Sequence, residues 1–171
     1  YDGLTFKRAT NLDIDHMVPL AEAWGSGAKK WNSNTRGRFS NDLSYRYSLI
    51  AVSASSNRSK SDSDPAEWMP PRKKFHCDYA KQYTAVKYRW HLKVNKAERT
   101  KLRRTIKSCS DKRILKPHRA DINTGSSGGG GGGGGRCDPN YAGACIPIVN
   151  YDLDCTDIPD RNFRVVGKDI H

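Results

Sequence analysis

A histidine with a carboxylate directly before it, Asp15-His16, is the pairing in this sequence best suited to chemistry. Hydrolysis of a phosphodiester needs a base that deprotonates water near neutral pH and a cation that stabilises charge on the phosphate. His16 has the right chemistry for the base, and Asp15 for the cation. As a bare dipeptide Asp-His is common, and its alternative role is a hydrogen bond at the end of a strand.

Three more polar residues follow: Asn41 in the run Asn-Asp-Leu, then Asn57 and Lys60. Each has an ordinary alternative. Asn41 is compatible with a plain turn, and Lys60 with a solvated surface lysine. Asn57-Arg58-Ser59 also forms a glycosylation sequon, which we discount because a glycan there would cover the proposed site.

A short strand must present the Asp-His pair. Residues 12–18 alternate apolar and polar side chains, and Pro19 stops the pattern. Strict alternation sends Asp15 and His16 to opposite faces, so one site for both requires the strand to bend or end there. A short helix is expected over residues 20–24, released at Gly25 and Gly27.

The remaining elements are expected to be mostly helical. Residues 41–56 contain a buried segment of undetermined type, and 64–67 read as a capping box that opens a short helix closed by Pro70-Pro71. A helix is predicted over 77–92, and a second capping box, Asn95 with Glu98, opens another. The first of these helices carries one apolar stripe, for which core packing is favoured over base stacking: Tyr79, Tyr83, Val86 and Trp90.

The five cysteines include no Cys-x-x-Cys pair, which argues against a zinc ribbon and for disulfides formed in an oxidising compartment. Cys77 opens the first long helix and Cys109 closes the second, so an antiparallel helix pair would join them. Cys137 and Cys145 are expected to close a tight loop, leaving Cys155 without a partner.

Charge and composition divide the chain. Residues 125–135 are a Gly/Ser linker, which separates a basic body at 1–124, with 26 Lys+Arg against 12 Asp+Glu, from a faintly acidic tail at 136–171. The net charge of +12 favours polyanionic partners. No apolar run reaches the roughly 18–20 residues of a membrane span. The chain opens without Met or a signal peptide, so a processed or trimmed product is expected. The protein is expected to be a monomer.

The order Asp-His-x-x-Pro, Asn-x-Leu, Asn-x-x-Lys resembles the signature of HNH (ββα-metal) nucleases. Residues 15–28, Asp-His-Met-Val-Pro-Leu-Ala-Glu-Ala-Trp-Gly-Ser-Gly-Ala, are more closely similar to secreted bacterial and fungal HNH proteins related to the C-terminal domain of GmrSD restriction enzymes. The likeness continues through 38–43, 49–52 and 64–71, and runs from about residue 1 to Cys109.

This resemblance implies an α+β fold: a ββα-metal (HNH) core with additional helices, plus a small disulfide-bearing tail module. It implies that His16 is the general base, that Asp15 and Asn57 hold one divalent cation, Mg²⁺ or alternatively Mn²⁺, and that Asn41 holds the loop that orients the base. Lys60 is the implied phosphate contact. Glu22 belongs to the same block, with a helix-surface carboxylate as the alternative.

Two features depart from the resemblance. The family usually has further sequence, with cysteines and strands, before the block that begins here at Tyr1-Asp2-Gly3. The tail resembles the cysteine-bearing modules called excalibur, but it stops before their Asp-rich loop, so calcium binding is in doubt and a spacer role is the alternative.

The expected function is that of a secreted, metal-dependent endonuclease of low sequence specificity, acting on DNA, with RNA left open. The alternative is a secreted protein that binds nucleic acid or another polyanion without chemistry. That alternative explains the charge but not the order in which Asp15, His16, Asn41 and Asn57 appear.

Overall fold

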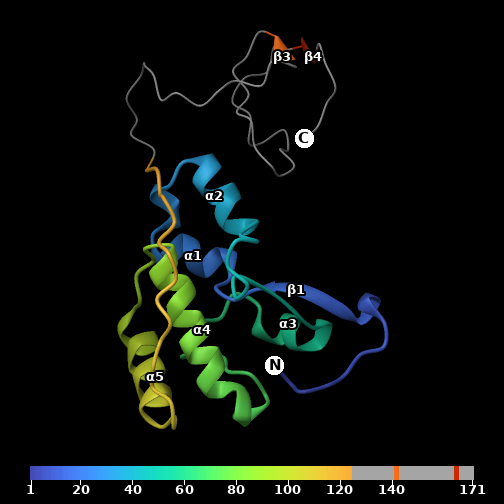
Figure 1. Ribbon diagram of the computed structural model, residues 1–171, viewed down its shortest axis with the longest axis vertical. Coiled ribbons are helices and arrows are strands. Elements are labelled where there is room, and N and C mark those ends of the chain that lie inside the picture. Colours follow the sequence, from blue (N-terminus) through green and yellow to red (C-terminus); the bar gives the residue numbers. More distant parts are fainter. Residues whose placement is uncertain (125–140, 143–163, 166–171) are drawn as a thin grey trace. The chain divides into compact units, whose positions relative to one another are not determined.

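The computed structural model describes residues 1–124, 141–142 and 164–165 (Figure 1). The chain divides into two units, Tyr1–Thr124 and Gly125–His171. In the second unit, β3 (Tyr141–Ala142) pairs antiparallel with β4 (Arg164–Val165). The predicted loop closed by Cys137 and Cys145, and the excalibur-like module, lie outside the described residues.

Two antiparallel strands and a following helix lie at one end of the first unit. A 3-10 turn, η1 (Ala9–Asn11), leads into β1 (Leu12–His16), which pairs with β2 (Leu49–Ser53) so that His16 lies opposite Leu49. Helix α3 (Ala54–Lys60) begins where β2 ends and packs on both strands. The Ser53 side chain caps α3 by accepting the backbone N–H of Ser56. The undetermined segment at 41–56 is therefore a loop, a strand and the start of a helix.

The chain between β1 and β2 forms two short helices. Pro19 precedes α1 (Leu20–Ser26), and Gly27, at φ 137°, ends it. The turn η2 (Ala28–Lys30) leads to α2 (Ser33–Ser40), which the sequence analysis did not anticipate. Asn32 caps α2 by accepting the N–H of Thr35 at 2.8 Å.

Two longer helices pack against each other, as predicted. The turn η3 (Lys73–Phe75) leads into α4 (His76–Arg89), and α5 (Lys96–Lys107) begins with both hydrogen bonds of the Asn95–Glu98 capping box. A disulfide joins Cys77 to Cys109, with 5.9 Å between their Cα atoms. The mixture of helices with a two-stranded sheet makes the fold α+β.

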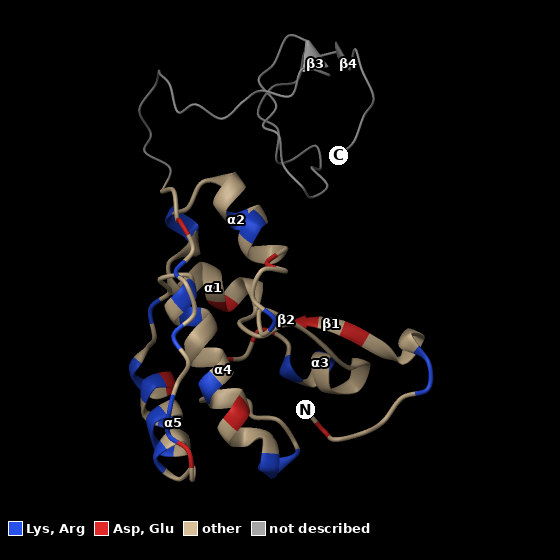
Figure 2. Ribbon diagram, viewed as in Figure 1, with Lys and Arg blue, Asp and Glu red and all other residues tan. Residues whose placement is uncertain are grey.

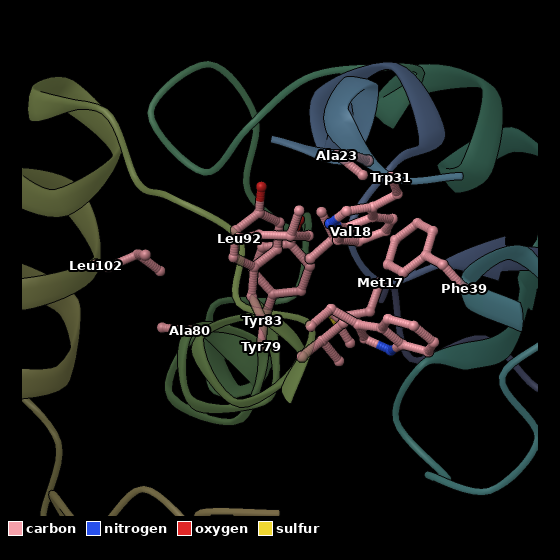
Figure 3. Packing of buried hydrophobic residues seen from close by; sticks show 13 residues of the cluster. Met17, Val18, Ala23, Trp31, Phe39, Tyr79, Ala80, Tyr83, Leu92 and Leu102 are labelled. Carbon is pink, nitrogen blue, oxygen red and sulfur yellow. The ribbon is translucent and has the colours of Figure 1, made fainter. Parts of the chain in front are cut away.

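The core lies between α4 and the end of β1 (Figure 3). The predicted stripe on α4 is core, because Tyr79, Tyr83, Val86 and Trp90 are each at most 2% exposed. Met17 and Val18, which follow β1, pack into the same cluster. The residue after Asp15-His16 is therefore anchored in the protein interior, which fixes the end of the strand.

One predicted helix is absent. Residues 65–67 form a turn, in which the Asp64 carboxylate accepts the N–H of Ala66 at 2.6 Å and its carbonyl accepts the N–H of Trp68 at 2.9 Å. The segment has few residues before Pro70-Pro71, and proline supplies no N–H to continue a helix. A helix-start signal at Asp64 is therefore followed by a single turn.

Within the described residues, no helix is long and apolar enough to cross a membrane.

Candidate active site

His16 is the last residue of β1, and its ring orientation is fixed. Its Nε2 lies 2.8 Å from the backbone carbonyl of Ser40, at the end of α2, and its ring stacks on Phe39 with centroids 6.4 Å apart. A carbonyl oxygen can only accept, so Nε2 carries the proton of this bond. In the neutral imidazole, Nδ1 is then the atom with a lone pair.

Asn41 stabilises the end of α2 that meets His16. Its side-chain amide donates to the Gly37 carbonyl at 3.2 Å and to Ser40 Oγ at 3.3 Å. These bonds hold Asn41 to the turn whose carbonyl accepts from His16. The structure thus places Asn41 next to the residue whose carbonyl contacts His16, and its part in orienting the base stays a prediction.

Asp15 is buried on the side of β1 that faces α3, with 4% of its surface exposed. Its Oδ1 accepts from Lys60 Nζ at 2.7 Å, and its Oδ2 accepts from the hydroxyl of Tyr1. Lys60 Nζ also donates to the His16 carbonyl at 2.7 Å. One lysine therefore holds the side chain of Asp15 and the backbone of His16 together.

Lys60 differs from its expected role. Its side chain is completely buried, so its ammonium does not lie at the surface where a phosphate would meet it. Burial lowers the pKa of Lys60, while the charge of Asp15 acts in the opposite direction. The Asp15 carboxylate and the position of Lys60 at the end of α3 account for this inward orientation. Lys60 is a positioning residue in this arrangement.

Asn57 lies against Asp13, with 3.1 Å between its Nδ2 and the Asp13 Oδ2. Asp13 and Asp15 alternate along β1 and so share a face, while Asn57 and Lys60 share one face of α3 at a spacing of three. Within residues 1–124, no hydrogen bond joins Asn57 to Asp15. The two expected cation ligands, Asp15 and Asn57, thus lie in the interface between β1 and α3 and have different hydrogen-bond partners.

Two residues of this site, Asp13 and Tyr1, were not predicted from the sequence. Asp13 was detectable, because the spacing Asp13-x-Asp15 places two carboxylates on one face of a strand. Tyr1 was not, since its contact with Asp15 depends on the path of the N-terminal segment. Burial, followed by the neighbouring Asp15 charge, raises the pKa of the Tyr1 hydroxyl, which therefore stays a donor.

The donor set suits a hard divalent cation. Asp13, Asp15 and Asn57 supply carboxylate and amide oxygens, the ligands that Mg²⁺ and Mn²⁺ prefer. Each carboxylate oxygen has two acceptor positions, so the bonds to Asp15 from Lys60 and Tyr1 leave one on each oxygen. In the described part of the chain, no three His, Cys, Asp or Glu side chains are grouped to hold a metal. A cation at this position would therefore depend on an amide oxygen, such as that of Asn57, beside the two carboxylates.

Glu22 lies outside this site. Lys87 Nζ donates to it at 2.6 Å, and the same ammonium pairs with Glu98 at 2.6 Å. Ser26 Oγ also donates to Glu22. Because Lys87 and Glu98 are buried, this network joins α1, α4 and α5 and has a structural role.

Comparison with known proteins gives two matches of different kinds. The family model of the C-terminal domain of GmrSD restriction endonucleases matches residues 2–105. A protein from Arthroderma benhamiae described as an uncharacterized secreted protein is 41% identical over 109 residues, which cover 64% of this chain and 53% of the relative. The chain thus spans about half the length of that relative. No solved structure matches significantly.

The family match includes β1, β2, α3 and most of α5, and so every residue of the candidate site except Tyr1. It extends over more than half of the chain. The protein therefore belongs to the family of the GmrSD restriction endonuclease C-terminal domain.

Proposed function

We propose that this protein is a secreted, metal-dependent endonuclease of the HNH (ββα-metal) type, with residues 1–124 as its nuclease domain. The observation that carries the proposal is the bond from His16 Nε2 to the Ser40 carbonyl at the end of β1. It leaves Nδ1 as the basic atom of a rigidly held imidazole. In this proposal the Gly/Ser linker at 125–135 connects the nuclease domain to a small appended module at 136–171.

In the proposed reaction, His16 Nδ1 takes a proton from the water that attacks phosphorus. The P–O bond to one sugar oxygen breaks as the new P–O bond forms, and the departing oxygen takes a proton from solvent. The imidazolium so formed is stabilised by its Nε2–H bond to the Ser40 carbonyl. Phe39, stacked on the ring, and Asn41, bonded at the end of α2, prevent the imidazole from rotating away. Rigid placement of this kind lowers the entropic cost of reaching the transition state.

The oxygens of Asp15 and Asn57, with Asp13 beside them, would hold one divalent cation, Mg²⁺ or Mn²⁺. Such a cation stabilises negative charge on the phosphate oxygens and orients the phosphate. Lys60 Nζ donates to the Asp15 carboxylate at 2.7 Å and so fixes its position between β1 and α3. The same lysine fixes the His16 carbonyl, so the base and the ligands move as one unit.

The charge of the domain supports a nucleic-acid substrate. Residues 1–124 have an excess of 14 basic side chains, several of them along α5 (Figure 2). Contacts of Lys and Arg with phosphate carry no base information. They are consistent with low sequence specificity, with DNA as the proposed substrate and RNA as a second one.

Secretion is supported by two observations. The Cys77–Cys109 disulfide is typical of an oxidising compartment. The relative from Arthroderma benhamiae is described as secreted.

A plasmid-nicking assay tests the proposal against non-catalytic binding of polyanions. Supercoiled DNA should be nicked and linearised with Mg²⁺ or Mn²⁺ and remain intact with EDTA. Gel-shift binding of the same DNA in EDTA measures affinity separately. Binding without cleavage under every metal condition would reject the endonuclease and favour the binding protein.

A further inference from the structure

A pocket of about 300 Å³ lies beside the loop that follows α2, and the residues that line it are not those of the candidate site. Tyr45 and Tyr47 come from this loop, Gln82 and Ala85 from α4, and Leu115 from the segment that follows α5. The two tyrosine rings meet edge to face, with centroids 5.4 Å apart. Aromatic and apolar groups of this kind suit a flat ring.

Gln82 gives the pocket an unused polar atom. Its side-chain oxygen Oε1 is buried and, in the described part of the chain, has no hydrogen-bond partner. A buried acceptor without a partner is costly and uncommon in folded proteins. A ligand with an N–H group would satisfy it.

The charged groups around the pocket cancel. Asp111 pairs with Lys81 at 3.8 Å and with Arg113 at 3.1 Å, and Asp78 lies 3.9 Å from the same lysine. These two cations and two anions leave the lining of the pocket itself with no net charge that would attract a phosphate into it. The chemistry favours a neutral, planar, N–H-bearing group, and the nucleobases are such groups.

Cations lie next to the aromatic rings. The Arg46 guanidinium lies over the Tyr47 ring, 4.5 Å from its centroid, and that of Arg89 lies 5.9 Å from the Tyr45 centroid. Arg46 is exposed, so its charge is available to a phosphate near a base held in the pocket. A stacking surface with an adjacent guanidinium is the combination that binds single strands.

The pocket is coupled to the candidate site through the loop at 41–48. At the start of this loop the Ser40 carbonyl accepts from His16, and at its end the Ser48 carbonyl accepts the N–H of Met17 at 2.9 Å. Leu49 pairs directly with His16, and Tyr47 lies two residues before it. The Cα atoms of Tyr47 and His16 are therefore within about 12 Å of each other. That separation is within reach of neighbouring nucleotides of one strand.

We propose that this pocket binds an unpaired nucleobase of the substrate strand, close to the phosphate that is cleaved. The inference rests on the proposed nuclease function and adds a substrate class to it. A base inside a duplex is stacked and paired and does not enter such a pocket without being flipped out. The protein should therefore prefer single strands, loops or frayed ends over intact duplex.

Binding measurements with the full chain carrying His16→Ala, in EDTA, test this without cleavage. The probes are a fluorescent single-stranded 12-mer, the same 12-mer with abasic sites at its central positions, and the matched duplex. The three probes share the phosphate backbone chemistry, so phosphate contacts alone would not separate the two single strands. We expect the intact single strand to bind about 5- to 100-fold more tightly than the abasic strand, the range that one or two base–aromatic stacks provide.

Two substitutions should reduce that difference, one of them completely. Tyr47→Ala should bring the intact strand to the affinity of the abasic strand. Gln82→Leu should weaken intact-strand binding about 3- to 10-fold, as the loss of one hydrogen bond predicts, without lowering thermal stability, because it removes an unsatisfied acceptor. The matched control is Tyr88→Ala: Tyr88 is also exposed on α4 with a guanidinium, that of Arg119, 4.5 Å from its ring centroid, but it does not line the pocket.

The outcomes separate this inference from the proposed function. Equal affinity for intact and abasic strands, or a full intact-strand preference in both Tyr47→Ala and Gln82→Leu, overturns the base pocket whatever the protein hydrolyses. A preference that is lost in Tyr47→Ala, reduced in Gln82→Leu and kept in Tyr88→Ala supports it, even if plasmid nicking is not observed. Failure of the endonuclease proposal would appear in the nicking assay alone.

Discussion

Lys60 Nζ donates to Asp15 Oδ1 at 2.7 Å and to the backbone carbonyl of His16 at the same distance, and its side chain is completely buried. The ammonium thus connects α3 to two consecutive residues of β1. Asp15 lies on the α3 side of the strand, while the His16 ring turns to Ser40. Asp15 and His16 point their side chains to different sides at the end of β1. The Lys60 ammonium nevertheless connects them, because it binds the side chain of Asp15 and the backbone of His16.

Lys60→Met should destabilise the fold by about 3–5 kcal/mol, because the Asp15 carboxylate would remain buried without its cation. Chemical denaturation followed by tryptophan fluorescence measures the change. The exposed Lys29→Met is the control and should change stability by less than about 0.5 kcal/mol. Similar stabilities for the two variants would mean that the buried ion pair is not formed in solution.

Acid should destabilise the loop at 41–48 through Asp42. Burial alone would raise the Asp42 pKa, but hydrogen bonds from Arg89, Ser44, Ser48 and Trp90 outweigh it, so the pKa is lowered. A carboxyl whose pKa is lower in the folded state contributes stability above its unfolded value, and that contribution is lost as the pH falls below about 4.

Asp42→Asn should therefore cost about 1.5–3 kcal/mol near neutral pH, the range for a hydrogen bond to a charged group. It should also flatten the acid limb of a plot of unfolding free energy against pH. Asp78→Asn, at a largely exposed carboxyl, is the control. Parallel acid limbs for Asp42→Asn and the unsubstituted protein would show that another carboxyl is responsible.

The elements with strong local signals were predictable from sequence. The Asn95–Glu98 capping box and the α4 stripe are determined by residues close together in the chain, and the structure has both. Helix α2 was missed because it lacks an apolar stripe and depends on the Asn32 cap and on core contacts of Phe39. The turn at 64–67 has a helix-start signal but too little chain before Pro70 to use it.

The site was predictable in its residue types more than in its contacts. Asp15 and Asn57 lie on facing elements, but which side chains pair depends on the register of α3 on β1, and that register places Asn57 on Asp13 and Lys60 on Asp15. The burial of Lys60 follows from that long-range packing. Tyr1 is brought to the site by aromatic contacts with Trp68 and Tyr79, far along the chain.

Removing the disulfide should reduce stability with little effect on chemistry. Cys77→Ser with Cys109→Ser opens a loop with a sequence separation of 32 residues and should cost about 3–4 kcal/mol by chain-entropy arguments. Hydrolysis at 20 °C should persist, because the bond joins α4 and α5 rather than elements of the candidate site. Peptide mapping without reductant verifies the bond, and free thiol at either cysteine in active protein would contradict it.

Asn57→Asp provides a test of cation binding that does not depend on activity. The substitution places a second carboxylate against Asp13, where the amide now donates at 3.1 Å. Repulsion should lower the Tm in EDTA by about 3–6 °C, and Mg²⁺ should restore it, with a larger Mg²⁺-dependent shift than in the unsubstituted protein.

Asn95→Asp is the matched control for this shift, because Asn95 donates to the Asp64 carboxylate at 2.6 Å, away from the candidate site. Its Tm should also fall, but Mg²⁺ should not restore it. Equal responses of both variants to Mg²⁺ would indicate general screening of charge and would remove the support for a cation at Asp13, Asp15 and Asn57.

His16→Ala should reduce hydrolysis about 10²- to 10⁴-fold, the usual contribution of a general base, while fold and DNA affinity are retained. The matched control is His76→Ala. His76 Nε2 also lies 2.8 Å from a backbone carbonyl, that of Pro70, but at the start of α4, so its loss removes the same kind of hydrogen bond without removing the proposed base. Initial rates on plasmid DNA at saturating Mg²⁺, with circular dichroism of each variant, make the comparison. Near-normal cleavage by His16→Ala, or an equal loss in folded His76→Ala, would place the base elsewhere, because the proposal assigns the base to the imidazole that is held at the end of β1 by the Ser40 carbonyl.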